Sequence, residues 1–526
     1  MTLPLFYVSS IKKTNISMQK QGVLVLLLSF FSFFTHAQVD PNAFGYYQDA
    51  LRYSQTITGG TARMQALGGA GTGLGGEISN AWLNPAGLGM IQRSLITGTP
   101  AVTSFNADAL YRGERTEDFR INANFSHLGI VLHLPTRYTS KYKGGSLALT
   151  FSRVNDFQRQ FTYEGRSDSV SIIDSFLDRA DGVPWSSLDD ELANGIFSEI
   201  GLAYSTYLIN PDVFFDSTSF DTYYSFVPGV SNIQNETVER RGAQNQFNIS
   251  YGGNYDDVLF FGFGLGIQQA NYRESRVYNE VFDQNDVISE LTLRDNLNVS
   301  GIGANLSAGL IVRAGNFLRL GWQIVTPTYM YMTEEYDADL TVLYRNFFFE
   351  EENVTLNREE AQTLILEAEY SVLTPFRTSL GASVFVGKRG FLTGEVEYLN
   401  YGSARLGSPS FADDFREDNN TIEALYTSAL NFKGGAEIRL DPIRLRGGVA
   451  FYADPIEDQD NQDLTIYSGG AGYMNENFAL DLVISYRSSE QTYVPYQVSD
   501  ASFNESAQIE GSTLNIGVTL SWFLND

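Results

Sequence analysis

Three glycines early in the chain have the spacing of a phosphate-binding loop. Gly71, Gly73 and Gly76 satisfy the pattern G-x-G-x-x-G. In nucleotide-binding proteins this pattern needs a strand before it and a helix after it, within one βαβ unit, so that the backbone can cradle the phosphate. Neither element is evident around these glycines, so the pattern does not indicate a nucleotide site.

Residues suited to nucleophilic catalysis are scarce. Beyond residue 37 the sequence has two histidines, His127 and His133, no cysteine, and neither of the motifs G-x-S-x-G and H-E-x-x-H. Ser126 and His127 form the only suggestive pair, but neighbouring side chains on a strand point to opposite faces and cannot bond each other. A hydrolase would need a different serine, so we name no catalytic residues and expect no enzyme.

One acidic stretch offers oxygen ligands for a cation. The sequence "DPIEDQDNQD" covers residues 454–463 and carries carboxylates of the kind that bind Ca²⁺. It lacks the glycine and the final glutamate of an EF-hand loop. A solvated acidic hairpin tip is therefore the favoured interpretation, and we expect no metal and no cofactor.

Composition separates the remaining classes of protein. The 526 residues include 48 Gly, 37 Phe, 30 Tyr and no Cys, and the mean hydropathy is −0.16. A helical membrane protein would be more hydrophobic, whereas a transmembrane β-barrel combines aromatics with glycines because only one face of each strand meets lipid. The net charge of −27 argues against nucleic acid as a partner, because phosphate binding needs a basic surface.

The first segment is typical of an export signal. Lys12, Lys13 and Lys20 precede the apolar run at residues 22–34, and the Thr-His-Ala that follows predicts cleavage behind Ala37. The run is too short to span a bilayer comfortably. No cysteine follows the predicted cleavage position, which excludes a lipoprotein. Residues 1–37 are therefore interpreted as a signal peptide.

Apolar and polar residues alternate repeatedly along the rest of the chain. In residues 513–522, for example, one face holds only apolar side chains, Leu514, Ile516, Val518, Leu520 and Trp522. This period predicts strands, and its continuation to the end of a long chain predicts an all-β fold, a transmembrane antiparallel barrel over residues 93–526. We expect an even number of strands, fourteen, near residues 93–106, 119–134, 145–163, 237–254, 257–275, 289–313, 316–343, 363–387, 389–402, 425–440, 442–453, 462–474, 476–490 and 510–524.

The connections between these strands alternate in length. Short turns such as "RAGNF" and "VGKRG" alternate with long loops, which is the asymmetry between the periplasmic and extracellular sides of a barrel. Long loops are predicted near residues 164–236, 276–288, 344–362, 403–424, 454–461 and 491–509. In the longest, helical spacing of apolar residues predicts helices over 171–182 and 187–204, the second capped by Ser187. They are expected to fold over the barrel mouth.

Residues 38–92 lie outside the predicted strands and are expected to fill the barrel. A fourteen-stranded barrel is wider than its inward side chains can fill, so without a plug it would be a water pore. In "LNPAG", Pro85 fixes one backbone angle and Asn84 can hydrogen-bond local backbone. We predict that Asn84, Pro85, Ala86 and Gly87 belong to a folded plug and hold its gate.

This plug sequence also resembles a known family. "GGTARMQALGGAGTGLGGEISNAWLNPAGLGM", residues 59–90, resembles the N-terminal hatch of the FadL/TodX outer-membrane transporters of long-chain fatty acids and aromatic hydrocarbons. The triplet Asn84-Pro85-Ala86 matches the plug motif of that family. The resemblance implies a fourteen-stranded barrel, a hatch inside it, and inward diffusion of hydrophobic molecules. The ligand residues of the family lie in divergent loops and cannot be transferred by position.

Three consecutive phenylalanines, Phe347, Phe348 and Phe349, lie in the predicted loop 344–362. If exposed, they would form an apolar patch, which usually marks a binding surface. One interpretation is a groove that captures hydrophobic ligands, completed by three residues of the longest loop, Phe176, Leu177 and Ile196. The other is that these side chains pack onto the loop helices as a small separate core.

The predicted third strand departs from alternation. The parity of its apolar residues also turns Arg153 and Arg159 toward lipid, and charge is costly at mid-depth in a bilayer. Either these arginines lie at the outer interface and meet lipid phosphates, or a bulge near Asn155 and Asp156 opens the wall sideways. The family resemblance implies such a lateral exit. Continuous pairing with the fourth strand through residues 153–158 would contradict it.

These features predict a plugged barrel in the outer membrane of a Gram-negative bacterium that takes up hydrophobic small molecules passively. Its partners would be the hydrophobic ligand and outer-membrane lipid. Two alternatives stay open: a barrel that serves protein secretion or surface assembly beside a secretion-machinery partner, and a general porin with a mobile plug. The ligand is not named, because apolar pockets encode size and shape weakly.

Overall fold

The computed structural model describes residues 45–57, 59–136, 140–212, 222–227, 230–284, 286–408, 415–456 and 463–524. The predicted signal peptide, residues 1–37, lies outside these ranges. No helix within the described ranges is long and apolar enough to cross a membrane.

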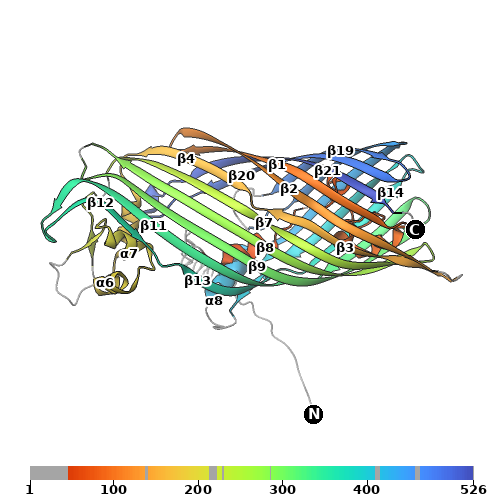
Figure 1. The fold of residues 1–526 in the computed structure, drawn as a ribbon, viewed down its shortest axis with the longest axis horizontal. Helices are drawn as coiled ribbons and strands as arrows, with labels where there is room; N and C mark the ends of the chain where they lie inside the picture. Colours follow the sequence, from red (N-terminus) through yellow and green to blue (C-terminus); the bar gives the residue numbers. More distant parts are fainter. Residues whose placement is uncertain are drawn as a thin grey trace, which may run out of the picture. The chain divides into compact units, whose positions relative to one another are not determined.

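Within the described residues, fourteen antiparallel strands form a closed wall, and several of them are divided into consecutive pieces. Figure 1 shows the barrel that they make. The sheet closes because β1 pairs with both β2 and β21, which confirms the predicted barrel. In order round the wall, the strands are β1 (Leu95–Tyr111), β2 (Glu114–Pro135), β3 with β4 (Tyr142–Asp156 and Arg159–Ser167), β7 (Asn232–Tyr255), β8 (Leu259–Phe282), β9 (Ile288–Ala314), β10 with β11 (Leu318–Val325 and Tyr329–Phe349), β12 with β13 and β14 (Val354–Gln362, Leu366–Leu373 and Arg377–Phe385), β15 with β16 (Gly390–Asn400 and Arg405–Gly407), β17 (Ser428–Leu440), β18 (Ile443–Tyr452), β19 (Leu464–Met474), β20 (Phe478–Tyr493) and β21 (Ala507–Phe523).

The alternation in the sequence separates the two faces of the wall. On β21, Leu520 is 50% exposed on the outside, whereas its neighbour Thr519 is 1% exposed and faces the lumen. Exposed leucine, isoleucine, valine and aromatic side chains recur on strands all round the barrel. An apolar outer band over a polar interior is the arrangement of a transmembrane barrel.

Two predicted long loops are strands instead. β8 continues to Phe282 and β9 begins at Ile288, and β11 continues to Phe349 with β12 beginning at Val354. The expected loops at 276–288 and 344–362 are therefore wrong in extent. The hydrogen-bonded pairing of these strands continues beyond the predicted ends, because it supplies partners for the backbone N–H and C=O groups whether or not the outer face of the strand meets lipid.

The longest connection does contain helices: α5 (Ile172–Ala180), α6 (Trp185–Asn194) and α7 (Glu199–Ser205). The second predicted helix is broken in two, because Gly195 adopts a φ of +112°, a conformation outside the helical region. The helix α6 also begins at Trp185, before the expected Ser187 cap. We call α5, α6 and α7 the cap; α6 and α7 lie beside β11 and β12 at one end of the barrel (Figure 1).

The remaining elements are short. They are α2 (Tyr47–Ser54), α3 (Ala62–Ala66), α4 (Asn80–Leu83) and the 3-10 helix η2 (Pro85–Met90) ahead of the wall, and β5 (Asn210–Pro211), β6 (Tyr223–Tyr224), η3 (Tyr401–Ser403), α8 (Arg416–Leu425) and η4 (Ala501–Phe503) within its connections.

Candidate functional site

The segment before β1 lies inside the wall. We call its described residues, 45–57 and 59–92, the hatch. The N–H of Ala62 donates to Oγ1 of Thr519 on β21 at 2.7 Å, and the N–H of Thr72 donates to Oε2 of Glu395 on β15 at 2.9 Å. Because β15 and β21 are not neighbours, the hatch spans the lumen. Most of its side chains are buried.

Asn84 joins two parts of the hatch. Its Oδ1 accepts the N–H of Ala86 at 3.2 Å, while its Nδ2 donates to the carbonyl oxygen of Thr72 at 2.7 Å. Pro85 follows at the first position of η2. A residue at this position makes no N–H hydrogen bond within the helix, so the absence of an N–H in proline removes no bond. The N–H of Gly87 donates to the carbonyl oxygen of Asn84 at 2.9 Å. The predicted turn is thus present, closed by its own side chain.

Glycines on the wall receive this turn. A Cβ on Gly262 of β8 would lie under 3.0 Å from the Pro85 backbone, and a Cβ on Gly309 of β9 would lie under 3.0 Å from the Asn84 side chain. Gly252 of β7 likewise faces Pro85. The sequence analysis did not assign these glycines a role. One feature of the sequence could have identified them: on β8, glycines such as Gly262 occupy the lumen-facing positions, whereas the outward-facing positions are apolar.

Buried ion pairs hold a second part of the hatch. Nε of Arg63 lies 3.3 Å from Oε2 of Glu437, which also bonds Nε of Arg446 at 2.8 Å. Glu77 accepts the Thr61 hydroxyl and the N–H of Ser79, each at 2.7 Å. Burial raises the pKa of Glu77, and these hydrogen bonds oppose the shift.

The third strand has a bulge where one was predicted, and its main-chain pairing is interrupted on its other side, toward β2. The β3 register with β7 shifts between Arg153 and Asn155 and then continues, with the N–H of Phe157 donating to Gly242 O at 3.1 Å. Pairing with the fourth strand therefore continues past the bulge, which contradicts an opening between these two strands at residues 153–158. Pairing with β2 instead ends at Ser152 opposite His127.

Beyond this point β4 pairs with β7, and each hydrogen bond between β4 and β2 in the described residues involves a side chain. Thr116 donates to the carbonyl oxygen of Thr162, and Nε2 of Gln160 lies 3.4 Å from Oδ1 of Asp118. We call this interval between β2 and β4 the side gap. In the described residues no main-chain ladder joins β2 to β4, although the two strands remain neighbours.

Hatch residues contact the strand break directly. The N–H of Ile57 donates to the carbonyl oxygen of Val154 at 2.8 Å, and Nδ2 of Asn155 donates to that of Gln55 at 3.2 Å. Arg153 lies 3.2 Å from Asp156, so its charge is paired within the chain. The alternative in which Arg153 meets lipid phosphates finds no support in this contact.

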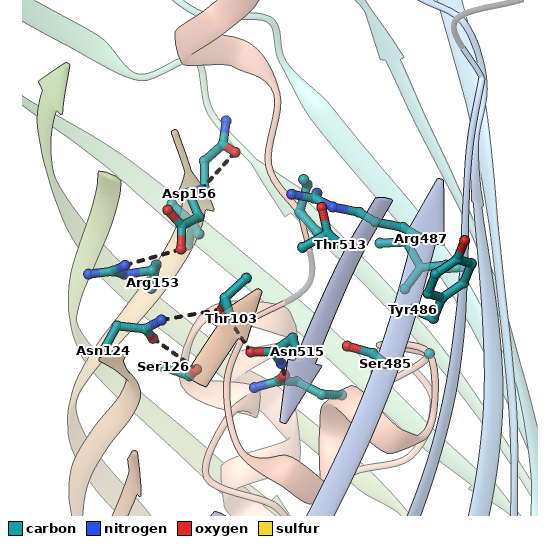
Figure 2. A pocket seen from close by; sticks show the side chains of 18 residues that line it. Thr103, Asn124, Ser126, Arg153, Asp156, Ser485, Tyr486, Arg487, Thr513 and Asn515 are labelled. Carbon is teal, nitrogen blue, oxygen red and sulfur yellow. Dashed lines mark hydrogen bonds and ion pairs between the residues drawn. The ribbon is translucent and has the colours of Figure 1, made fainter. Parts of the chain in front are cut away.

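A cavity of about 110 Å³ lies between the hatch and the strand break. Most of its labelled side chains are polar (Figure 2). They come from β1 to β3 on one side and from β20 and β21 on the other, and include Thr103, Asn124, Ser126, Asp156, Arg487, Thr513 and Asn515.

The three phenylalanines are not exposed together. Phe349 is 5% exposed and Phe347 packs beside it, while Phe348 is 51% exposed on the opposite face. These residues lie on β11, where side chains alternate between the two faces, so they do not form one continuous exposed patch. Phe176 is buried in the same cluster, with Leu177 and Ile196 partly buried against it. These contacts agree with the second interpretation, in which the side chains pack onto the loop helices as a small separate core.

The histidines lack catalytic surroundings. Nδ1 of His127 lies 2.9 Å from Oγ of Ser152, and Ser126 bonds Asn124 instead. Of the contacts made by the described residues, none joins His127 to a carboxylate, which a catalytic triad would use to orient the ring. The same part of the chain holds no cluster of three metal-ligating side chains. Much of the acidic stretch 454–463 lies outside it.

Comparison with solved structures gives the same architecture. The fold is similar to that of the P. putida toluene transporter TodX (TM-score 0.50, 12% identity, covering 89% of this chain and 100% of that one). It is also similar to a Pseudomonas aeruginosa FadL homologue (TM-score 0.51, 10% identity, covering 89% and 99%). The predicted resemblance to FadL/TodX is thus confirmed at the level of the fold. No family model and no curated protein matches the sequence.

Proposed function

We propose that the protein is an outer-membrane channel through which hydrophobic small molecules diffuse passively past the hatch. The observation that carries the proposal is a lumen filled by the chain's own segment, held by contacts such as Ala62 to Thr519. Hydrogen bonds and ion pairs can be exchanged locally, so a hatch held by them can shift while the barrel stays folded.

The fold likeness supports the class of cargo. One of the similar structures is described as a toluene transporter and the other as a FadL homologue. We infer that this chain carries hydrocarbons or long-chain fatty acids. The apolar outer band agrees with a site in the outer membrane, in contact with its lipid, after export by the predicted signal peptide.

The proposed route has three stages. Ligands are captured at the cap, at the edge of its buried core, where Phe347, Leu177 and Ile196 are only partly buried. They pass the gate held by Asn84, Pro85, Ala86 and Gly87. They leave sideways through the side gap, next to Arg153, Asn155 and Asp156. No bond is broken along this route, so it requires no catalytic residue.

The test is to identify what the protein carries. The mature chain would be purified from outer membranes in mild detergent and extracted with organic solvent for mass spectrometry. Fatty acids or hydrocarbons enriched over a control barrel would support the proposal. A clean extract, with another protein in the same chromatographic peak, would contradict it and favour a secretion partner. Steady ion conductance by the wild type would contradict it in favour of a general porin.

A further inference from the structure

The outer face of β2 is apolar over an unusually long stretch. Its outward side chains are apolar from Phe119, near the turn to β1, to Leu134 at the opposite end, and a bulge at Ser126 keeps them on one face. Phe119 and Ile121 are the most exposed of them, at 62% and 60%. We call the following set the β2 stripe: Phe119, Ile121, Ala123, Phe125, Leu128, Ile130, Leu132 and Leu134.

The β2 stripe is longer than a bilayer requires. It spans residues 119–134, sixteen positions, whereas a tilted strand crosses the hydrocarbon core in about 9–11 residues. On β21 the outward apolar run from Leu514 to Trp522 has nine positions. The excess on β2 is therefore about five residues, or roughly 16 Å along the strand. A bilayer of uniform thickness would leave this excess in water.

The turn between β1 and β2 lies near the cap. The hydroxyl of Tyr111, beside this turn, donates to Oε1 of Gln234 on β7 at 2.6 Å. Nε2 of Gln234 in turn donates to the carbonyl oxygen of Val170, just ahead of α5, at 3.0 Å. Long connections mark the extracellular side of a barrel, so Phe119 lies toward the extracellular end of β2.

Cross-strand pairing places the excess at this end. Phe119 pairs with Asn106 of β1, and Asn106 pairs with Ser512 of β21. Ser488 of β20 continues the same row, opposite Ser512. The outward side chains of three neighbouring strands in this row are thus polar, while that of β2 is a phenylalanine. The neighbouring strands have already left the apolar band where β2 has not.

The β2 stripe runs beside the side gap. On the other face of β2, Thr116 contacts the Thr162 carbonyl oxygen of β4 across that gap. Closer to the hatch, the inward side chains of Asn124 and Ser126 line the cavity, and Figure 2 shows both on one side of it. One strand therefore separates the polar cavity from an apolar outer surface, and whatever covers that surface also borders the gap.

We propose that outer-leaflet lipid covers the whole β2 stripe, so that the bilayer stands higher against β2 than against β20 and β21. The stripe is continuous with the apolar band round the barrel, and removal of apolar surface from water favours lipid contact along all of it. A bilayer thickens locally around a hydrophobic segment longer than itself. The charged residues Glu114, Arg115 and Glu117 end the stripe at the turn. This inference goes beyond the proposed uptake, since it concerns lipid contact and holds whatever the channel carries.

Single-cysteine variants test this contact, because the natural chain has no cysteine. Nitroxide labels would be attached to Phe119→Cys, Ile121→Cys, Leu132→Cys and Ser488→Cys in vesicles of phosphatidylethanolamine and phosphatidylglycerol. Collisions with oxygen, which concentrates in hydrocarbon, are compared with collisions with a water-soluble nickel chelate. We expect the labels at residues 119 and 121 to favour oxygen, as the label at residue 132 within the band does. Ser488→Cys, the matched control in the row of Phe119, should favour nickel.

The outcomes decide between lipid and other surroundings. Nickel collisions at residues 119 and 121 as frequent as those at residue 488 would overturn the proposal. So would labels at residue 119 that collide with neither reagent and broaden each other's spectra, because a second copy of the chain would then cover the stripe. Oxygen collisions at residue 132 show in every preparation that the barrel is inserted in lipid. No cargo enters this measurement, so its failure and the failure of the proposed function are separate results.

Discussion

Nδ2 of Asn84 lies 2.7 Å from the carbonyl oxygen of Thr72, a residue twelve positions earlier in the chain. The same side chain reaches the wall, where Gly309 leaves room for it. One amide therefore joins the glycine-rich loop of the hatch, the turn at Pro85 and the barrel. The gate proposed from the sequence depends on this residue in a way that can be measured.

Replacing Asn84 with Asp keeps the shape of the side chain and removes its hydrogen-bond donor, the amide NH₂ group. Asn84→Asp turns a carboxylate toward the Thr72 carbonyl oxygen, so a buried hydrogen bond is replaced by repulsion between two oxygens. The loss of this bond is expected to destabilise the folded hatch by about 1–3 kcal/mol. We expect the hatch to loosen and ion conductance across planar bilayers to rise. The control is Asn357→Asp on the exposed strand β12. Unchanged conductance and uptake in Asn84→Asp would exclude the gating role.

The close approach of hatch and wall predicts a steric effect. Gly262→Ala places a methyl group against the Pro85 backbone, and overpacking of this kind costs about 1–3 kcal/mol. We expect faster proteolysis of the hatch and higher conductance. Gly447→Ala meets no atom within 4 Å and should leave both properties as in the wild type. If the two variants behave alike, the glycines do not seat the hatch.

The buried charge network predicts a loss of stability. Glu437→Gln leaves Arg63 and Arg446 without their shared carboxylate, and breaking a buried pair costs about 3–5 kcal/mol. Urea unfolding followed by tryptophan fluorescence should show this loss. Glu490→Gln, an exposed position on β20, provides the reference. A cost below about 1 kcal/mol, the level of exposed pairs, would mean that solvent screens the network.

The hatch should weaken as pH rises. Burial raises the pKa of Glu77 above its ordinary value of 4.5. The folded state therefore binds the proton of the Glu77 carboxyl more tightly than the unfolded state does. The stabilisation that this protonated carboxyl gives is complete below pH 4.5 and is lost as the pH rises through the pKa of the folded state. Glu77→Gln should unfold like the wild type below about pH 4.5 and become relatively more stable as the pH rises above it, measured by hydrogen exchange of the hatch amides. If the difference in stability between Glu77→Gln and the wild type did not change with pH, a role for the Glu77 proton would be excluded.

The side gap can be closed by a covalent bond, since the natural chain has no cysteine. Thr116 on β2 contacts the Thr162 backbone on β4, so the double variant Thr116→Cys with Thr162→Cys should form a disulfide. We expect oxidation to stop ligand uptake and reduction to restore it. Leu132→Cys with Leu147→Cys joins β2 and β3 where their ladder is intact and should have no effect. Uptake through the oxidised gap variant would rule out lateral exit there.

Strand number was predictable because alternation is a local property. Each outward side chain in residues 513–522 is apolar and each inward one is polar or glycine, and only a strand with two different environments needs this pattern. Hatch residues such as Asn84 and Pro85 were recognised by their turn chemistry, which is also local. The φ of Gly195 interrupts the helix, and the bulge after Arg153 shifts the pairing with β7 by one residue. At these places the expected single helix and the expected opening between the third and fourth strands were wrong.

The sequence by itself determined the fourteen-stranded barrel and the turn at "LNPAG", because both follow from neighbours within a few residues. Tertiary structure alone decided that Gly262 and Gly309 face the hatch, and that the main-chain ladder between β2 and the third strand ends at Ser152. These relationships join residues up to several hundred positions apart, and only closure of the barrel brings them within a few ångströms of each other.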